Sequence, residues 1–152
     1  MTYFLVKLIL SAQVTLTDLP EALPLLRLNI NENKSKISSM GGYAIAESLV
    51  WGDSTSQILK EEFDIIVLAD CVYYEEALDP LVQTLQCFTN TITKKPTMYL
   101  TQEMRDSEVQ KRLWTKFFEK LNEIFNVEQI PEEEQHKNYR SPDILLFKIT
   151  KK

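Results

Sequence analysis

Glycine is scarce in this chain, which has only three glycines among 152 residues. They are Gly41, Gly42 and Gly52, so a G-x-G-x-x-G turn is excluded, because that motif needs three glycines within six positions. A Walker loop, in which glycines precede a lysine and a hydroxyl residue, is excluded too. Such turns let the backbone approach a phosphate or cofactor where a Cβ would intrude. These 152 residues therefore encode no glycine-rich cradle for a nucleotide.

Histidine and cysteine are also rare. The single histidine, His136, excludes a multi-histidine metal site, and its neighbours Glu132–Glu134 and Lys137 indicate a solvated loop. The two cysteines, Cys71 and Cys87, do not make a disulfide framework. We expect both to be reduced thiols in a cytoplasmic protein that holds no metal.

No apolar run is long enough to span a bilayer. The N-terminal segment Met1–Leu10 is apolar but is interrupted by Lys7, and it falls far short of the roughly 20 residues that a spanning helix needs. We expect a buried helix or strand there. The net charge of −5 disfavours broad nucleic-acid binding, which needs clustered basic residues. Residues 1–152 have enough hydrophobic side chains, 44%, for one domain, which we expect to be monomeric.

Hydrophobic periodicity predicts strands that alternate with helices. The expected strands are Val14–Thr17, Ala46–Val50, Asp64–Leu68, Thr97–Thr101, Phe125–Ile130 and Asp143–Ile149. The expected helices are one that begins near Pro20, Leu78–Phe88 and Ser107–Ile124, and a polar loop is expected at Asn31–Gly42. This order predicts an open α/β sheet with ligands at the carboxyl ends of the strands, and an edge hairpin formed by the last two strands. The continuous apolar run at Asp64–Leu68 predicts a strand covered on both faces.

Two candidate cofactor residues close the first two strands. Asp18 ends the run VTLTD, where a carboxylate can accept hydrogen bonds from both hydroxyls of a ribose. The alternative is a helix N-cap for a segment that starts at Leu19 or Pro20. Trp51 ends the next strand just before Gly52, where an indole can lie against an adenine. The alternative for this side chain is core packing.

The segment ADCVYY follows the most apolar strand. The small side chain of Ala69 lets a flat ligand approach the backbone, while Asp70, Tyr73 and Tyr74 are expected to face the crevice that takes the substrate. The alternative is a capping carboxylate with two packed aromatic rings. Glu103, Arg105 and Asp106 are expected at the rim of the same crevice, or else in an exposed charged loop.

Four segments of the chain carry a family resemblance. They read VTLTDLPEALPLLRLNINENK, LVWGD, FDIIVLADCVYYEEALDPLVQTL and HKNYRSPDILLFKI. Together they resemble the methyltransferase-like family of seven-strand protein-lysine methyltransferases over Val14–Lys152. The D-x-x-Y element from Asp70 to Tyr73 is fairly specific to this group when it follows such a strand. Within the family, the resemblance is greatest to the branch that methylates valosin-containing protein, the p97 AAA ATPase.

The resemblance implies a class I, Rossmann-like methyltransferase sheet with a C-terminal antiparallel hairpin. It implies S-adenosyl-L-methionine as the cofactor and a protein lysine ε-amine as the methyl acceptor, with p97 as the expected partner. The residues implied to contact the cofactor are Asp18 at the ribose, Trp51 at the adenine, and Ala69 and Tyr74 beside it. The residues implied to lie near the methyl group and the incoming lysine are Asp70 and Tyr73.

The chain departs from the family pattern at its N-terminus. Family members carry a first strand and a glycine-rich turn before the segment that matches Val14, whereas Met1–Gln13 contains no glycine. We therefore expect a partial methyltransferase domain of doubtful activity, in which the strands that end at Asp18 and Ala69 lie apart. A non-catalytic protein-binding module derived from a methyltransferase is the alternative. A small-molecule methyltransferase is disfavoured, because the segment from Asp70 fits the protein-lysine group.

Overall fold

The computed structural model describes residues 12–90, 95–104 and 106–152. The chain divides into two compact units, Met1–Val50 and Trp51–Lys152, each described below by itself. The order of strands and helices along the chain is the predicted one. The helix or strand predicted for Met1–Leu10 lies outside the described residues. No helix in the described part is long and apolar enough to cross a membrane.

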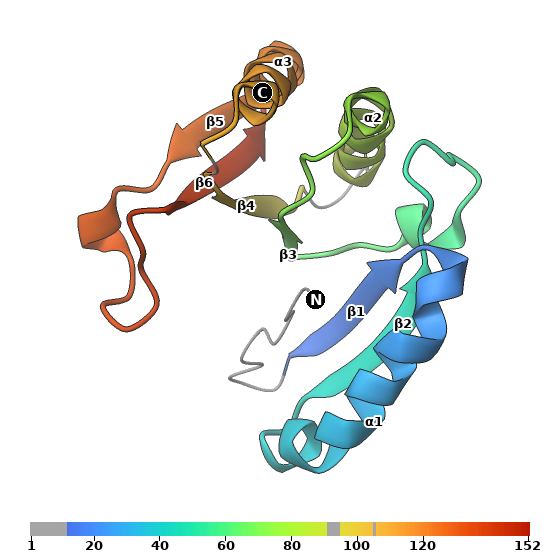
Figure 1. Cartoon of the computed structure of the whole chain (residues 1–152). Coiled ribbons are helices and arrows are strands. Elements are labelled where there is room, and N and C mark those ends of the chain that lie inside the picture. The colour runs from blue at the N-terminus through green and yellow to red at the C-terminus, as the bar shows by residue number, and fades with distance from the viewer. Residues whose placement is uncertain (1–11, 91–94, 105) are drawn as a thin grey trace. The chain divides into compact units, whose positions relative to one another are not determined.

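The first unit is a β-α-β arrangement. Strand β1 (Gln13–Asp18) pairs in parallel with β2 (Tyr43–Ser48), and α1 (Leu23–Ser39) connects them and lies along both strands (Figure 1). The buried hydrophobic residues of this unit are Leu23, Ala46 and Leu49. Because parallel strands end at the same edge, Asp18 lies at the carboxyl edge of this two-stranded sheet.

The loop predicted at Asn31–Gly42 is wrong, because α1 continues through most of it. Polar side chains do not break a helix when no glycine or proline interrupts it. The helix ends where Gly41 adopts a φ of 73°. The Gly41 N–H then donates to the Ser38 carbonyl and the Gly42 N–H to the Ile37 carbonyl, both at 3.0 Å. This pair of hydrogen bonds is a Schellman motif.

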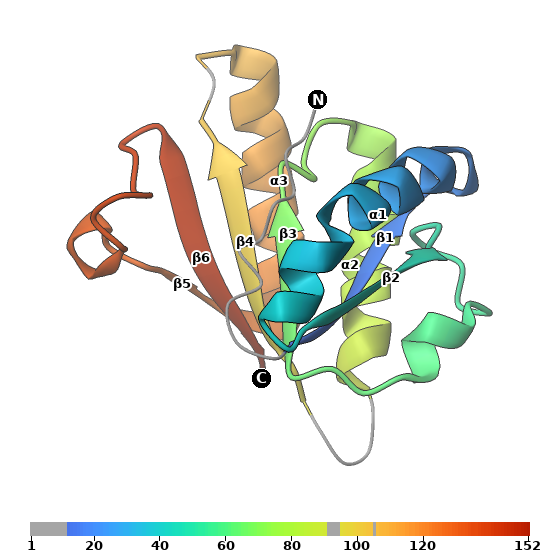
Figure 2. The same cartoon turned by 90° about the horizontal axis from the view of Figure 1, so that it is seen from below.

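The second unit is built on a four-stranded sheet. Its strands lie in the order β3 (Ile65–Ala69), β4 (Thr97–Glu103), β6 (Ile144–Lys151) and β5 (Phe125–Gln129), as Figure 2 shows. β3 and β4 are parallel, whereas β6 is antiparallel to both β4 and β5. The predicted antiparallel hairpin at one edge of the sheet is therefore confirmed.

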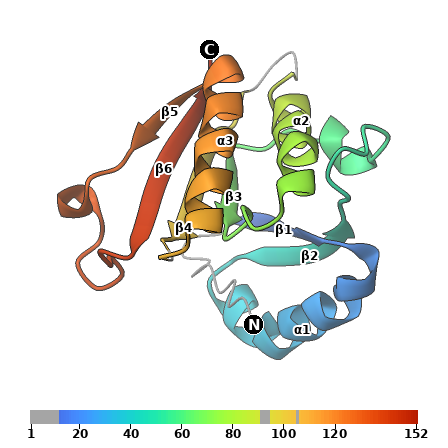
Figure 3. The same cartoon turned by 45° about the horizontal axis from the view of Figure 1, so that its top comes forward.

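Two helices, α2 (Leu78–Thr89) and α3 (Glu108–Ile124), lie side by side on one face of this sheet (Figure 3). The apolar face of α2 is formed by the buried residues Leu78, Leu81, Leu85 and Phe88. The apolar face of α3 is formed by the buried Leu113, Phe117 and Leu121 and the half-buried Ile124. These side chains form a continuous core with the sheet residues beneath them.

Strand β3 is not covered on both faces in the described structure, contrary to the prediction. Leu68 is buried and Ile66 packs against the core, but Ile65 and Val67 on the opposite face are 56% and 44% exposed. The physical reason is that β3 is an edge strand and that α2 and α3 cover one face of its sheet. Within the described residues, β1 and β3 belong to different sheets, as expected for the strands that end at Asp18 and Ala69.

Candidate functional site

Asp18 is exposed at the end of β1. Its backbone carbonyl accepts a hydrogen bond from the Leu49 N–H at 3.0 Å, and its carboxylate Oδ1 accepts one from the Leu19 N–H at 2.8 Å. The following short 3₁₀ helix, Pro20–Ala22, has Leu19 as its N-cap and no side-chain cap. The N-cap alternative for Asp18 is therefore wrong, and the carboxylate faces solvent at the carboxyl edge of the first unit.

Trp51 does not end a strand, contrary to the prediction. β2 stops at Ser48 because its partner β1 has only six residues to pair with, and Trp51 lies in the turn that follows. The indole is half-buried and packs against the core of the second unit, so core packing accounts for part of its surface. The next residue, Gly52, has a φ of 86° and its N–H donates to Thr84 Oγ1 at 2.9 Å. This bond anchors the turn to α2.

Asp70 joins the carboxyl ends of β3 and β4. Ala69 is the last residue of β3, opposite Thr101 of β4. Asp70 then turns into the left-handed region with a φ of 50°, and its N–H donates to the Thr101 carbonyl at 3.0 Å. Its carboxylate Oδ1 accepts a hydrogen bond from the Glu103 N–H at 3.1 Å. The carboxylate thus has a capping role on β4 and remains exposed to solvent.

Tyr73 and Tyr74 are exposed, and their rings pack against each other rather than in the core. Their exposed fractions are 52% and 64%, and their rings meet edge to face with centroids 4.7 Å apart. Val72, which precedes them, is completely buried. Glu75, which follows them, is ion-paired with Lys116 of α3. The hydrogen bond from this lysine, and then its charge, lower the pKa of Glu75 below its ordinary value.

The predicted rim residues Glu103 and Asp106 make local contacts that stabilise the fold, and Arg105 lies outside the described residues. Glu103 contributes its backbone N–H to Asp70, and Asp106 forms an exposed ion pair with Lys111 at 2.9 Å. The hydrogen bond from Lys111 lowers the pKa of Asp106, as expected for an exposed charged loop. Gln110 was missed by the sequence reasoning, and its side chain donates to the Val72 carbonyl at 3.2 Å.

Most of the predicted residues belong to the second unit. They are Trp51, Ala69, Asp70, Tyr73 and Tyr74, whereas Asp18 belongs to the first unit. Ala69 to Tyr74 run from the carboxyl end of β3, as predicted. That Asp18, Trp51, Ala69, Asp70 and Tyr73 line one crevice stays a prediction.

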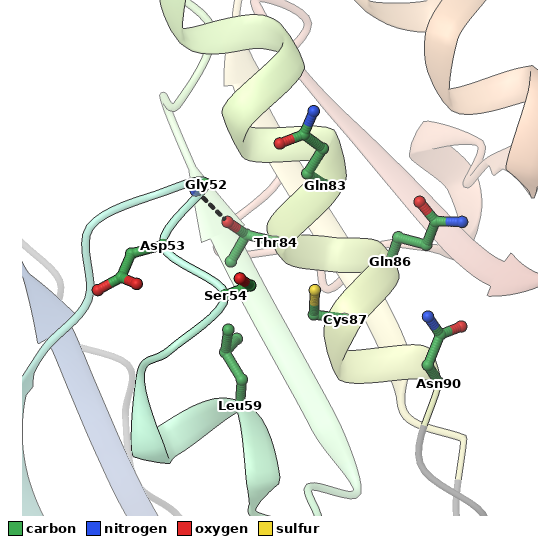
Figure 4. A pocket seen from close by; sticks show the side chains of 9 residues that line it. All are labelled: Gly52, Asp53, Ser54, Leu59, Gln83, Thr84, Gln86, Cys87 and Asn90. Carbon is green, nitrogen blue, oxygen red and sulfur yellow. Dashed lines mark hydrogen bonds between the residues drawn. The ribbon is translucent and has the colours of Figure 1, made fainter.

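A cavity of about 250 Å³ lies along α2 in the second unit (Figure 4). Its lining residues are Gly52, Asp53, Ser54, Leu59, Gln83, Thr84, Gln86, Cys87 and Asn90. None of the predicted site residues lines this cavity, although one of its lining residues, Gly52, directly follows Trp51 in the chain. The part of the chain that the structure describes holds no cluster of three His, Cys, Asp or Glu residues that could bind a metal.

Comparison with protein families decides the kinship of the chain. The family model for lysine methyltransferases matches residues 4–124. The chain belongs to the lysine methyltransferase family. The predicted family resemblance is thereby confirmed for the three quoted segments that lie within residues 4–124.

Curated relatives carry names of the same kind. Mouse protein N-lysine methyltransferase METTL21A is 34% identical over 90 residues, which cover 58% of this chain and 40% of the relative. Yeast (Saccharomyces cerevisiae) protein-lysine N-methyltransferase EFM6 is 27% identical over 148 residues, or 92% of this chain and 56% of the relative. Mouse protein-lysine methyltransferase METTL21E is 31% identical, covering 95% and 54%. The chain spans about half the length of these relatives.

Solved structures establish the fold. The N-methyltransferase NodS from Bradyrhizobium japonicum, in complex with S-adenosyl-L-homocysteine, superposes with a TM-score of 0.54 at 17% identity, covering 91% of this chain and 66% of NodS. A putative O-methyltransferase from Nostoc punctiforme gives a TM-score of 0.51 at 7% identity, covering 91% and 44%. The predicted class I methyltransferase fold is confirmed.

Proposed function

We propose that this chain serves the transfer of a methyl group from S-adenosyl-L-methionine to a lysine ε-amine of a protein. The observation that carries the proposal is the D-x-x-Y segment of a lysine methyltransferase family member. Two hydrogen bonds hold Asp70 between the ends of β3 and β4, and the exposed Tyr73 and Tyr74 follow it. Open α/β sheets bind their ligands at this edge.

The residues of this chain fit some parts of S-adenosyl-L-methionine better than others. Asp18 is exposed at a strand end and suits the ribose hydroxyls, and the half-buried indole of Trp51 leaves ring surface for an adenine. The methionine part of the cofactor needs a close approach to backbone. None of the three glycines belongs to a G-x-G-x-x-G turn, so we propose that the 152-residue chain by itself holds S-adenosyl-L-methionine weakly.

The residues of the second unit then act on the lysine. S-adenosyl-L-methionine, when bound, supplies a methyl group already activated by its sulfonium. The hydroxyl groups of the exposed residues Tyr73 and Tyr74 and the carboxylate of Asp70 accept hydrogen bonds from the ε-amine and hold it in line for attack. Removal of the amine from water lowers its pKa, which favours the neutral, nucleophilic form.

We further propose that p97 is the first protein substrate to test. We also propose that this chain belongs to a monomeric, cytoplasmic protein. The support for p97 is the resemblance of the four quoted segments to the branch that methylates it. Cys71 and Cys87 are not joined in a disulfide, which agrees with a reducing compartment.

A methyl-transfer assay tests the proposal. Two polypeptides are incubated with S-adenosyl-L-methionine labelled on its methyl group and with p97. One is the 152-residue chain, and the other carries the strand and glycine-rich turn of mouse METTL21A in front of it. We expect Asp70→Asn and Tyr73→Phe to lower the labelling by about tenfold or more, because they disturb the alignment of the amine. The matched control is Tyr43→Phe. Tyr43 is an exposed tyrosine at the start of β2, the end of the strand away from its carboxyl edge. Equal labelling by all variants, or no lysine labelling of p97 or of a mixture of other proteins, contradicts the proposal.

The scarcity of glycine favours a second candidate, a non-catalytic module that docks on the same partner. In that case the 152-residue chain binds p97 without any cofactor present, and neither polypeptide labels it. Co-sedimentation of the chain with p97, run beside the labelling assay, separates the two functions.

A further inference from the structure

The segment from Asp70 to Glu75 is held by contacts with neighbouring elements. Asp70 is bound to β4 through its N–H and its carboxylate, and Glu75 is ion-paired with Lys116 of α3. Between them, the Val72 carbonyl accepts a hydrogen bond from Gln110 Nε2 of α3 at 3.2 Å. Two exposed tyrosines follow Val72, and the carbonyl of the second, Tyr74, accepts a hydrogen bond from the Ala77 N–H at 3.3 Å.

Gln110 bonds to Val72 although its position suits a helix-capping role. Ser107 is the N-cap of α3, and the spacing S-x-x-Q from Ser107 to Gln110 is that of a capping box, in which the two side chains would bond each other's backbone N–H groups. In the structure Ser107 makes no side-chain cap, and Gln110 reaches instead across to Val72. Departures from such local rules concentrate at functional sites.

The hydrogen bond from Gln110 lies directly before the tyrosine pair. The Val72 side chain is completely buried in the core, and Gln110 holds its carbonyl, so the peptide that leads into Tyr73 has little freedom. Tyr74 is extended, with φ −129° and ψ 138°, and its ring meets that of Tyr73 at an interplanar angle of 70°. The Gln110 bond is partly buried, so water competes with it less than with an exposed bond.

We propose that Gln110 is a positioning residue that fixes the Tyr73–Tyr74 pair through the Val72 carbonyl. The pair's use in holding a substrate lysine rests on the proposed function, whereas the positioning itself does not. Gln110 acts through the backbone and touches no reacting atom. Its loss removes the hydrogen bond that holds the peptide leading into Tyr73, so we expect the mutual orientation of the two rings to change.

Fluorine NMR of the 152-residue chain labelled with 3-fluorotyrosine tests this directly. The chain has six tyrosines, whose signals are assigned by single Tyr→Phe variants. In Gln110→Ala we expect the Tyr73 and Tyr74 signals to shift and narrow, while those of Tyr43 and Tyr99 stay in place. Gln110→Glu should behave alike, because a carboxylate cannot donate to a carbonyl at neutral pH. Glu119→Ala, an exposed change on the same helix, should move none of them.

Unchanged Tyr73 and Tyr74 signals in a folded Gln110→Ala overturn the inference, even if the variant is less stable. Should Gln110→Ala fail to fold, the size-matched Gln110→Glu decides in the same way. In the polypeptide extended with the METTL21A turn, Gln110→Ala should lower kcat for methyl transfer by about fivefold and leave the KM for S-adenosyl-L-methionine unchanged. Absence of methyl transfer in the parent polypeptide defeats the proposed function, while the NMR result still decides the role of Gln110.

Discussion

At Asp70 the backbone takes a conformation that most side chains avoid. A φ of 50° lies in the left-handed region, which Asp and Asn tolerate because their short polar side chains bond locally. Here the side chain bonds the Glu103 N–H. One residue thus both turns the chain at the end of β3 and presents a carboxylate at the carboxyl edge of the sheet.

This geometry predicts a contrast between two substitutions of Asp70. Asp70→Ala should lower the free energy of unfolding by about 1–2 kcal/mol, because alanine is strained at this φ and cannot accept the Glu103 N–H. Asp70→Asn should cost less than about 0.5 kcal/mol, because its amide oxygen can still accept that bond. Urea unfolding of both variants measures the difference. Equal stabilities would show that the turn is not held in this way.

The sequence predicted which residues lie at the strand ends but not how they are held. Asp18, Ala69 and Asp70 were placed correctly because a polar residue follows each apolar run. The left-handed turn at Asp70 and the bond from Gln110 to Val72 were not predicted. Their partners lie 33 and 38 residues away in the chain, and no local pattern encodes such contacts.

Among the elements, α2 and α3 were the most predictable, because a regular apolar face and a buried face coincide on each. The region Asn31–Gly42 was misread as a loop, since a polar surface helix carries little periodic signal and only Gly41 marks its end. The continuous apolar run of β3 indicated burial on both faces. Periodicity cannot reveal that Ile65 and Val67 lie on a face that α2 and α3 leave open.

The ion pair between Lys116 of α3 and Glu75 predicts that stability depends on pH. Lys116 lowers the pKa of Glu75 below its ordinary value of 4.5. A lowered folded-state pKa means that the ion pair adds stability above the ordinary pKa and that this stability is lost as the pH falls through the lowered value. The effect is small because both side chains are largely exposed.

An NMR titration of the Glu75 carboxyl carbon measures this. We expect a midpoint below 4.5 in the parent chain and a return to the ordinary range in Lys116→Ala or in 1 M salt. Lys111→Ala, which removes the partner of Asp106, is the control and should leave the Glu75 titration unchanged. An unshifted midpoint in the parent chain would mean that the ion pair does not form in solution.

Across the described residues of the molecule, burial is concentrated in the second unit. A continuous core of buried side chains from β3 to β6 includes the completely buried Met98, Phe117 and Leu121. The described part of the first unit, residues 12–50, buries a much smaller set of hydrophobic side chains. We therefore expect its amides to open at lower free energy than those of the second unit.

Hydrogen exchange followed by NMR checks this expectation. Amides in β4 and α3 should exchange at least about ten times more slowly than those in β1 and β2, a difference of roughly 1.4 kcal/mol in opening free energy. Leu121→Ala should speed exchange throughout the second unit. Equal protection in both units would show that they open together.

Cofactor affinity tests the central claim most directly. The residues that we propose for the ribose, the adenine and the lysine belong to this chain, but no G-x-G-x-x-G turn for the methionine part is among its 152 residues. Isothermal titration of S-adenosyl-L-methionine compares the 152-residue chain with the polypeptide extended by the METTL21A turn. Several missing backbone hydrogen bonds, each worth about 0.5–1.5 kcal/mol, predict that the shorter chain binds at least about tenfold more weakly. Asp18→Ala should also weaken the binding of S-adenosyl-L-methionine by the extended polypeptide. Equal affinity of the two polypeptides, or tight binding that ignores Asp18→Ala, would contradict the account.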